Sequence, residues 1–212
     1  IVEAPLGSRT KLTLPDGTLV WLNAGSRITY SQGFGVGNRK IELIGEGYFE
    51  VKRNEEVPFL VKTNSLLVKV LGTKFNFRDY PDDAEAIVSL SEGKVALNNL
   101  LKKEKEAFLL PNERVVLNKK NGRMHVEYST VSNALQWTNG YLFFDEELLP
   151  DVVKELERSY NVKIQIASDT LNTFRFYGNF VHREQNIQEV LEALSATRKI
   201  HYIIEGHNIT LY

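Results

Sequence analysis

Residues 14–23, which read LPDGTLVWLN, carry the clearest structural signal in the chain: a tight turn that leads directly into a strand. Pro15 presets the backbone φ angle of the turn, and Gly17 accepts the positive φ that other residues resist. The same order of apolar end, polar turn and apolar strand returns in residues 90–97 (LSEGKVAL) and 110–118 (LPNERVVLN). Stacked β-rungs would produce such echoes, but any antiparallel protein can reuse this turn, so a solenoid and a sandwich both stay open.

Short strands and tight turns continue outward from this stretch, from Arg9 to about Tyr128. The strand candidates recur at intervals of about 8–12 residues, which is typical of all-β domains. They are residues 12–14, 18–22, 40–44, 48–52, 59–62, 66–71, 75–80, 85–90, 94–97, 107–110, 114–117 and 123–128. We therefore predict that residues 1–128 form an all-β domain, solenoid-like or sandwich-like.

The pattern changes near Ser129. Residues 129–140 are expected to connect two domains, with a short helix over 130–138 that a Ser or Thr caps. Apolar stripes of helical spacing then predict helices over 145–160 and 183–196, the first opened by the acidic residues 145–147. Strands are expected at 141–144, 162–166 and 174–181, and as a hairpin over 200–212. Residues 141–212 are thus predicted to be a small β-α-β-β-α-β-β domain, with two helices on one sheet, which makes the fold class mainly β plus α+β.

Composition narrows the function classes. The 26 basic and 27 acidic residues give a net charge of −1, which argues against a nucleic-acid partner and gives no reason to expect docking on an anionic membrane. The chain has no cysteine, so disulfides, thiolate catalysis and Cys-ligated metals are excluded. No run approaches the roughly 20 apolar residues that span a bilayer. The chain opens without a Met or a signal peptide, so we expect it to be a piece of a longer protein.

Several residues resemble chemical motifs, but a structural interpretation suits each of them better. Asp16 supplies one carboxylate only, which is too few for a calcium loop. Residues 33–37 (GFGVG) precede a strand and not a helix, unlike a dinucleotide-binding loop. Glu46 and Glu50 would need a pocket to act as an acid–base pair. The four histidines lack the spacing of a zinc site. We therefore predict no catalytic, cofactor or metal site.

Five ordered segments of the first half resemble the FecR domain: residues 14–26, 41–51 (IELIGEGYFEV), 58–61, 70–77 (VLGTKFNF) and 90–95. Gly47 stands where the family has Ala, a small-for-small change. Residues 141–144 (YLFF), 156–162 (LERSYNV) and 176–180 (FYGNF) are similar to the domain that follows FecR in Bacteroidetes anti-sigma factors. That domain is related to the short N-terminal signalling domain of secretins and TonB-dependent transducers.

The resemblance implies the periplasmic sensor portion of a single-pass inner-membrane anti-sigma factor, and not an enzyme. Such a protein relays a signal from a TonB-dependent outer-membrane transducer, which has bound an iron chelate or a glycan, to an extracytoplasmic-function sigma factor. The partner of this chain would be the signalling domain of the transducer. The sigma factor would bind a cytoplasmic segment that this chain lacks, and membrane contact would need a transmembrane helix that it also lacks.

Exposed sheet edges suit such a relay, because their unpaired backbone groups can accept a further strand. One candidate edge is the hairpin over 200–212, with Tyr202 and Tyr212 as anchors. The other is the strand over 174–180, although a core role competes for its aromatic residues, Phe174, Phe176, Tyr177 and Phe180.

The alternative hypothesis is that the chain is a periplasmic carbohydrate-binding module. It would use aromatic residues of the β domain, Trp21, Tyr30 and Phe34. For Trp21 a core position is the competing interpretation.

Overall fold

The computed structural model describes residues 1–212, and the chain divides into two compact units. The N-terminal unit comprises Ile1–Pro5 and Arg9–Leu135, and the C-terminal unit comprises Leu6–Ser8 and Gln136–Tyr212. The short segment Leu6–Ser8 joins the C-terminal unit through the Gly7 N–H, which donates to the Arg158 carbonyl at 2.8 Å. Each unit has a hydrophobic core of its own.

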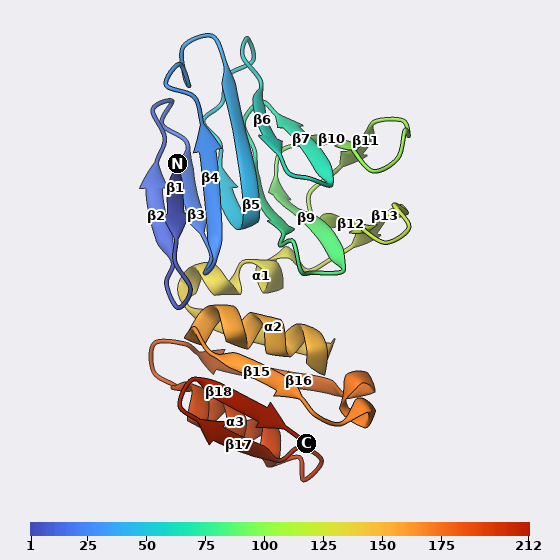
Figure 1. Cartoon of the computed structure of the whole chain (residues 1–212). Coiled ribbons are helices and arrows are strands. Elements are labelled where there is room, and N and C mark those ends of the chain that lie inside the picture. The colour runs from blue at the N-terminus through green and yellow to red at the C-terminus, as the bar shows by residue number, and fades with distance from the viewer. The chain divides into compact units, whose positions relative to one another are not determined.

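The N-terminal unit is built from thirteen strands and one short helix (Figure 1). The strands are β1 (Val2–Ala4), β2 (Thr10–Thr13), β3 (Leu19–Leu22), β4 (Ser26–Tyr30), β5 (Arg39–Glu50), β6 (Phe59–Lys62), β7 (Leu66–Val70), β8 (Lys74–Asp79), β9 (Glu85–Glu92), β10 (Val95–Asn99), β11 (Ala107–Leu109), β12 (Glu113–Asn118) and β13 (Met124–Tyr128). The helix α1 (Val131–Ala134) follows them.

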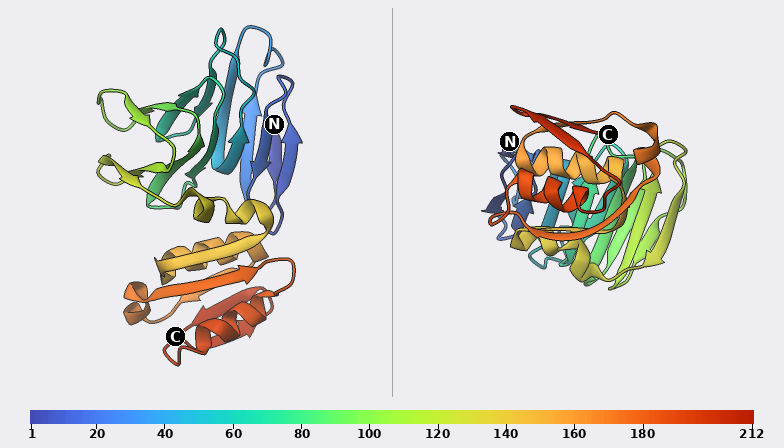
Figure 2. Two further views of the ribbon diagram at one scale, coloured as in Figure 1. Left: turned by 180° about the vertical axis from the view of Figure 1, so that it is seen from behind. Right: turned by 90° about the horizontal axis from the view of Figure 1, so that it is seen from below.

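Strand β5 belongs to two layers. Its first half pairs with β4 and β6, in a layer ordered β1-β4-β5-β6-β7-β10-β11, which we call sheet A. Its second half pairs with β3 and β8, in a layer ordered β2-β3-β5-β8-β9-β12-β13, which we call sheet B. All neighbours are antiparallel except β5 and β6. Together the strands form one nearly closed, barrel-like sheet (Figure 2).

The passage of β5 from sheet A to sheet B depends on Gly45. Its φ of +99° lies in the region that residues with a side chain avoid. A Cβ at this position would also lie 2.4 Å from Ser26 Oγ and 2.9 Å from Ser26 Cα, so the two backbones could not approach each other. The sequence-based expectation of two strands, over 40–44 and 48–52, is therefore wrong: the strand is continuous and changes layers at the glycine.

The core of the N-terminal unit lies between the two layers. Strand residues alternate between this core and the surface, as in β3, where Val20 and Leu22 are fully buried. The largest side chains of the core are aromatic, and they include the stacked pair Phe49 and Phe75, with ring centroids 5.1 Å apart.

The three sequence echoes are not equivalent rungs of a solenoid. The turn in residues 14–23 is a hairpin that joins β2 and β3 within sheet B. The turns in residues 90–97 and 110–118 instead join strands of different sheets, β9 to β10 and β11 to β12. The echoes therefore reflect turn chemistry used in two structural settings.

The C-terminal unit contains two helices, two small sheets and two 3-10 turns. In chain order these are η1 (Gln136–Asn139), β14 (Tyr141–Leu148), α2 (Leu149–Tyr160), β15 (Lys163–Ile166), η2 (Asp169–Thr173), β16 (Arg175–Val181), α3 (Ile187–Ser195), β17 (Tyr202–Glu205) and β18 (Asn208–Leu211). The prediction of one sheet is wrong, because β14 pairs only with β16, while β15, β18 and β17 form a second sheet. The helices lie between the two sheets, which both contribute residues to the core (Figure 2).

Helix α2 begins later than the acidic residues 145–147 suggested. Strand β14 continues through them to Leu148, with a bulge between Phe144 and Glu147. Glu146 adopts a φ of +53° in this bulge, and its carbonyl accepts a hydrogen bond from Arg175 at 2.7 Å. Pro150 lies in the first turn of the helix, where its missing N–H breaks no helical bond.

The Ser or Thr cap predicted for the first helix is not formed, whereas α3, for which no cap was predicted, is capped. Thr130 occupies the N-cap position of α1, but its side chain makes no capping hydrogen bond. Helix α3 instead begins with a complete capping box, in which Asn186 accepts from the Glu189 N–H and Glu189 accepts from the Asn186 N–H.

We expect Asn186→Ala to lower the free energy of unfolding of the C-terminal unit by about 1 kcal/mol, because an N–H of the first turn of α3 loses its acceptor. Chemical denaturation measures this change. Thr130→Ala is the matched control, and it should change stability by less than about 0.5 kcal/mol because no cap is lost. Equal effects of the two substitutions would contradict the assignment.

Candidate functional site

The two-stranded sheet of β14 and β16 has one buried face. Phe176 and Phe180, two of the interface candidates, lie on that face with 6% and 5% of their surface exposed. Their rings stack at 6.1 Å with an interplanar angle of 6°, and both contact Phe144. Gly178 lies between them on β16, and a Cβ there would come within 2.6 Å of the Phe176 ring. These two phenyl groups are therefore core residues with no surface to offer a partner.

The opposite face of this sheet carries exposed aromatic side chains. Tyr177 is 67% exposed, and its ring lies 6.2 Å from that of Phe143 on the neighbouring strand, in an edge-on arrangement. Tyr141 is also exposed, two residues before Phe143 on β14. We call Tyr141, Phe143 and Tyr177 the aromatic face. Because β16 pairs only with β14, its other side has no strand partner and borders this face as an open edge.

The second sheet has β15 and β17 as its edge strands, and β17 is the edge that belongs to the predicted hairpin. Tyr202 at the start of this strand is half-buried and packs on the core, whereas Tyr212 is 48% exposed. Ile203 and Ile204 of β17 are exposed as well, and the sequence-based choice of anchors missed them although the strand itself was expected. Phe174, the remaining candidate, is half-buried against the core, with Lys199 Nζ 5.8 Å from its ring centre.

The aromatic residues of the carbohydrate hypothesis do not form one platform. Phe34 is buried in the core with 3% exposure. The core position considered for Trp21 is wrong. It points outward from sheet B, where it is half-buried beside Tyr48 and lies under Lys11 Nζ at 4.4 Å. Tyr30 lies at the end of β4 in sheet A. Stacking of one sugar chain on all three rings is therefore excluded by their positions.

The carboxylates that resembled catalytic groups hold the fold together. Glu46 accepts hydrogen bonds from Asn23 at 2.9 Å and Asn76 at 2.8 Å, and all three side chains are buried. Glu50 accepts one from the Tyr48 hydroxyl at 3.2 Å. Burial, together with the neighbouring Glu50 charge, raises the pKa of Tyr48, so its hydroxyl keeps its proton to a higher pH than an exposed tyrosine does. No group of three or more His, Asp or Glu side chains is placed to hold a metal ion.

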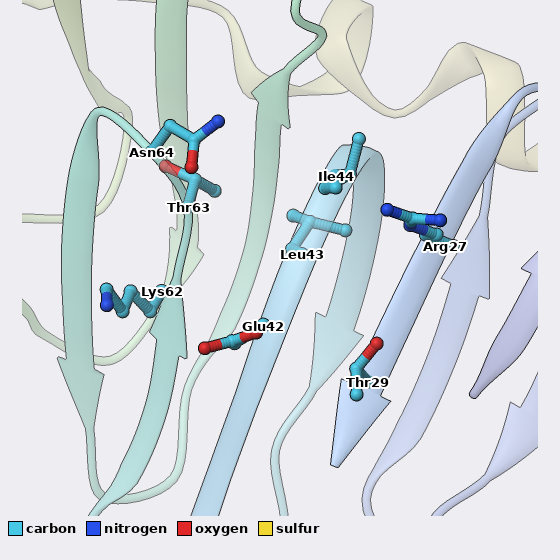
Figure 3. Close-up of a pocket in the computed structure, with 8 residues that line it drawn as sticks. All are labelled: Arg27, Thr29, Glu42, Leu43, Ile44, Lys62, Thr63 and Asn64. Carbon is cyan, nitrogen blue, oxygen red and sulfur yellow. The ribbon is translucent and has the colours of Figure 1, made fainter.

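An open groove runs along the outer face of sheet A, over β4, β5 and β6 (Figure 3). Its wider part encloses about 760 Å³ and its narrower part about 140 Å³. Thr29, Glu42 and Lys62 line both parts, so the two form one continuous feature. None of the residues proposed from the sequence as protein anchors lies in this groove.

The chain thus combines a barrel-like all-β unit with an α+β unit, in which two helices lie between two sheets. Residues 1–96 match the family model described as FecR protein, and residues 141–211 match the model described as FecR, C-terminal. No curated protein matches the chain.

Solved structures agree with the family models. Two crystal structures, at 1.65 and 2.50 Å, of a candidate anti-sigma factor from Parabacteroides distasonis are 34% identical to this chain, with a TM-score of 0.90. The match covers 100% of this chain and 97% of theirs. The chain therefore belongs to the FecR family of anti-sigma factors, a family that regulates and does not catalyse. None of its helices has the length and apolar character needed to cross a membrane.

Proposed function

We propose that this chain is the periplasmic sensor portion of an inner-membrane anti-sigma factor, and that it receives a signal from a TonB-dependent outer-membrane transducer. The signalling domain of the transducer docks on the C-terminal unit. The signal then passes to an extracytoplasmic-function sigma factor, held by a cytoplasmic segment outside this chain. Family membership supports the regulatory role, and the surface of the C-terminal unit supports recognition by a protein.

The aromatic face of β14 and β16 is the observation that carries this proposal. Tyrosine and phenylalanine provide large contact areas with few rotatable bonds, and such residues dominate the binding energy of many interfaces. Phe143 pairs with Asn179 across the sheet, and its ring packs edge-on against that of Tyr177, so the two rings already restrict each other before a partner covers them. The open edge of β16 offers backbone groups to an incoming strand beside these rings.

Calorimetric titration of this chain with the signalling domain of the transducer encoded beside it tests the proposal. We expect Tyr177→Ala to weaken binding about tenfold or more, since loss of an interface aromatic removes at least about 1.4 kcal/mol. Tyr212→Ala is the matched control, because it removes an exposed tyrosine from the other sheet.

Three outcomes are distinct. Loss of binding in the Tyr177→Ala variant alone supports the aromatic face as the docking surface. Loss with Tyr212→Ala alone places the interface at the β17 edge and contradicts our choice of surface. No binding of the unmodified chain, with both proteins shown to be folded by circular dichroism, contradicts the receiver function for this transducer.

A further inference from the structure

The groove on sheet A exists because β5 leaves its neighbour β6. On this side of β5, pairing with β6 ends at Glu42, and pairing with β8 begins at Gly45. Leu43 and Ile44 therefore have a strand partner only on the other side, in β4. The turn after β6, with Thr63 and Asn64, forms the opposite wall of the opening (Figure 3). The concavity is thus a consequence of the split strand and not of a loose loop.

The cations of this groove have no partners within the protein. Arg27, Lys40 and Lys62 are exposed and take part in no ion pair, and no carboxylate approaches any of them within ion-pair distance. Other surface cations of the same unit are paired, such as Arg53 with Glu55 and Lys74 with Glu92. Lys69, which follows Leu67 on the same face, adds a further exposed cation. An excess of positive charge therefore gathers here, in a chain whose net charge is −1.

The groove also offers groups that bind hydroxyls. Glu42 lies between Thr29 of β4 and Lys62 of β6 in the strand registers, so an acceptor carboxylate sits among the cations. Thr29, Ser31, Asn38 and Asn64 supply further hydroxyl and amide groups, and Leu60 and Leu67 give the floor an apolar part. Glu42 would repel a ligand that is only negative, but it accepts hydrogen bonds from a ligand that carries hydroxyls beside its negative groups.

We propose that this groove binds an acidic oligosaccharide, with Arg27, Lys40 and Lys62 contacting its carboxylates and Glu42 accepting from its hydroxyls. The ligand class follows from the mixture of groups: the cations select negative charge, and Glu42 with the Thr, Ser and Asn side chains selects hydroxyl groups. The volume of about 760 Å³ falls in the range of small-molecule sites. This site is independent of the proposed docking of a transducer on the C-terminal unit.

Titration of the whole chain with an oligogalacturonate tests the site, with NMR or calorimetry as the readout. The fully methyl-esterified oligosaccharide of the same length is the first control, because it keeps the ring hydroxyls and removes the charge. An oligoglutamate of equal charge is the second control, because it keeps carboxylates and removes the hydroxyls. We expect the oligogalacturonate to bind more tightly than either control, and its binding to weaken with added salt.

Variants then locate the site. Arg27→Gln and Lys62→Gln should each weaken binding about threefold to tenfold, whereas Lys103→Gln, in an exposed loop of the same unit, should leave it unchanged. Glu42→Gln should reduce the preference for the oligogalacturonate over the oligoglutamate, because a repulsion against the peptide is removed. The proposal is overturned if the methyl ester or the oligoglutamate binds as tightly as the oligogalacturonate, or if the oligogalacturonate does not bind at all. It is also overturned if Lys103→Gln weakens binding as much as Arg27→Gln and Lys62→Gln do.

Discussion

Asp16→Ala should destabilise the N-terminal unit by about 3–5 kcal/mol, the usual effect of removing one partner from a buried ion pair. The Asp16 carboxylate accepts from Arg39 Nη1 at 3.2 Å, and the two side chains are only 8% and 3% exposed. The same carboxylate accepts from the backbone N–H and the hydroxyl of Thr18, both at 2.9 Å, which closes the turn after β2. The substitution therefore removes the negative charge beside a buried cation and the acceptor that closes a turn.

Arg39 would keep only neutral partners in this variant. Its guanidinium donates to the carbonyls of Lys52 at 2.7 Å, of Asn54 at 3.2 Å and of Val57 at 2.5 and 2.8 Å. These bonds fix the segment between β5 and β6, but they do not neutralise the charge. Hydrogen exchange measured during denaturation gives the stability of each unit separately, because peptides from β5 and β6 report on the N-terminal unit alone.

The surface pair of Arg53 with Glu55 is the matched control for this prediction. Its side chains are 76% and 66% exposed, so water screens the interaction. Arg53→Ala should therefore change stability by less than about 1 kcal/mol. A loss below about 1 kcal/mol for Asp16→Ala would show that the Asp16–Arg39 pair does not stabilise the fold.

Gly45→Ala should lower the stability of the N-terminal unit by about 2–6 kcal/mol, from two additive causes. A φ of +99° strains any residue with a Cβ by about 1–3 kcal/mol. The new methyl group would also overlap Ser26, including its Cα at 2.9 Å, and overpacking adds about 1–3 kcal/mol. Because one of the overlapping atoms is backbone, a change of rotamer cannot relieve the strain. The shift of the denaturation midpoint measures the effect.

Gly37→Ala separates the two causes. Gly37 also has a positive φ, +82°, but no atom lies within 4 Å of the position that a Cβ would take. This variant should therefore show the backbone strain without the overlap, and lose clearly less stability than Gly45→Ala. If the two variants were equally destabilised, the close contact between β4 and β5 at Ser26 would have no energetic role.

Local signals in the sequence were sufficient for the strands but not for their pairing. Turn residues such as Pro15 and Gly17 predicted the turn between β2 and β3, and periodicity predicted most strands of the N-terminal unit. The residues around Gly45 were interpreted as a break between two strands, because glycine weakens a strand and is typical of bends and turns as well. In the C-terminal unit the parallel pairing of β15 with β18 joins residues far apart in the chain, which local periodicity cannot reveal.

The sequence was also informative for one candidate surface and uninformative for the other. Alternation along β16 places Phe176 and Phe180 on one face and Tyr177 on the other, so the exposed residue could have been separated from the buried ones by the strand period alone. The groove on sheet A could not have been predicted in this way. Its lining comes from β4, β5 and β6, and its shape depends on where β5 exchanges one neighbour for another.

The shared strand also governs how the N-terminal unit comes apart. Because β5 is the common member of both layers, loosening either layer withdraws a central strand from the other. Neither sheet can therefore melt alone, and the unit gains the all-or-none cooperativity of a single folding block. The same connection delays its assembly, since β5 is complete only after partners from β3 to β8 have reached it, and pairings over such separations form slowly.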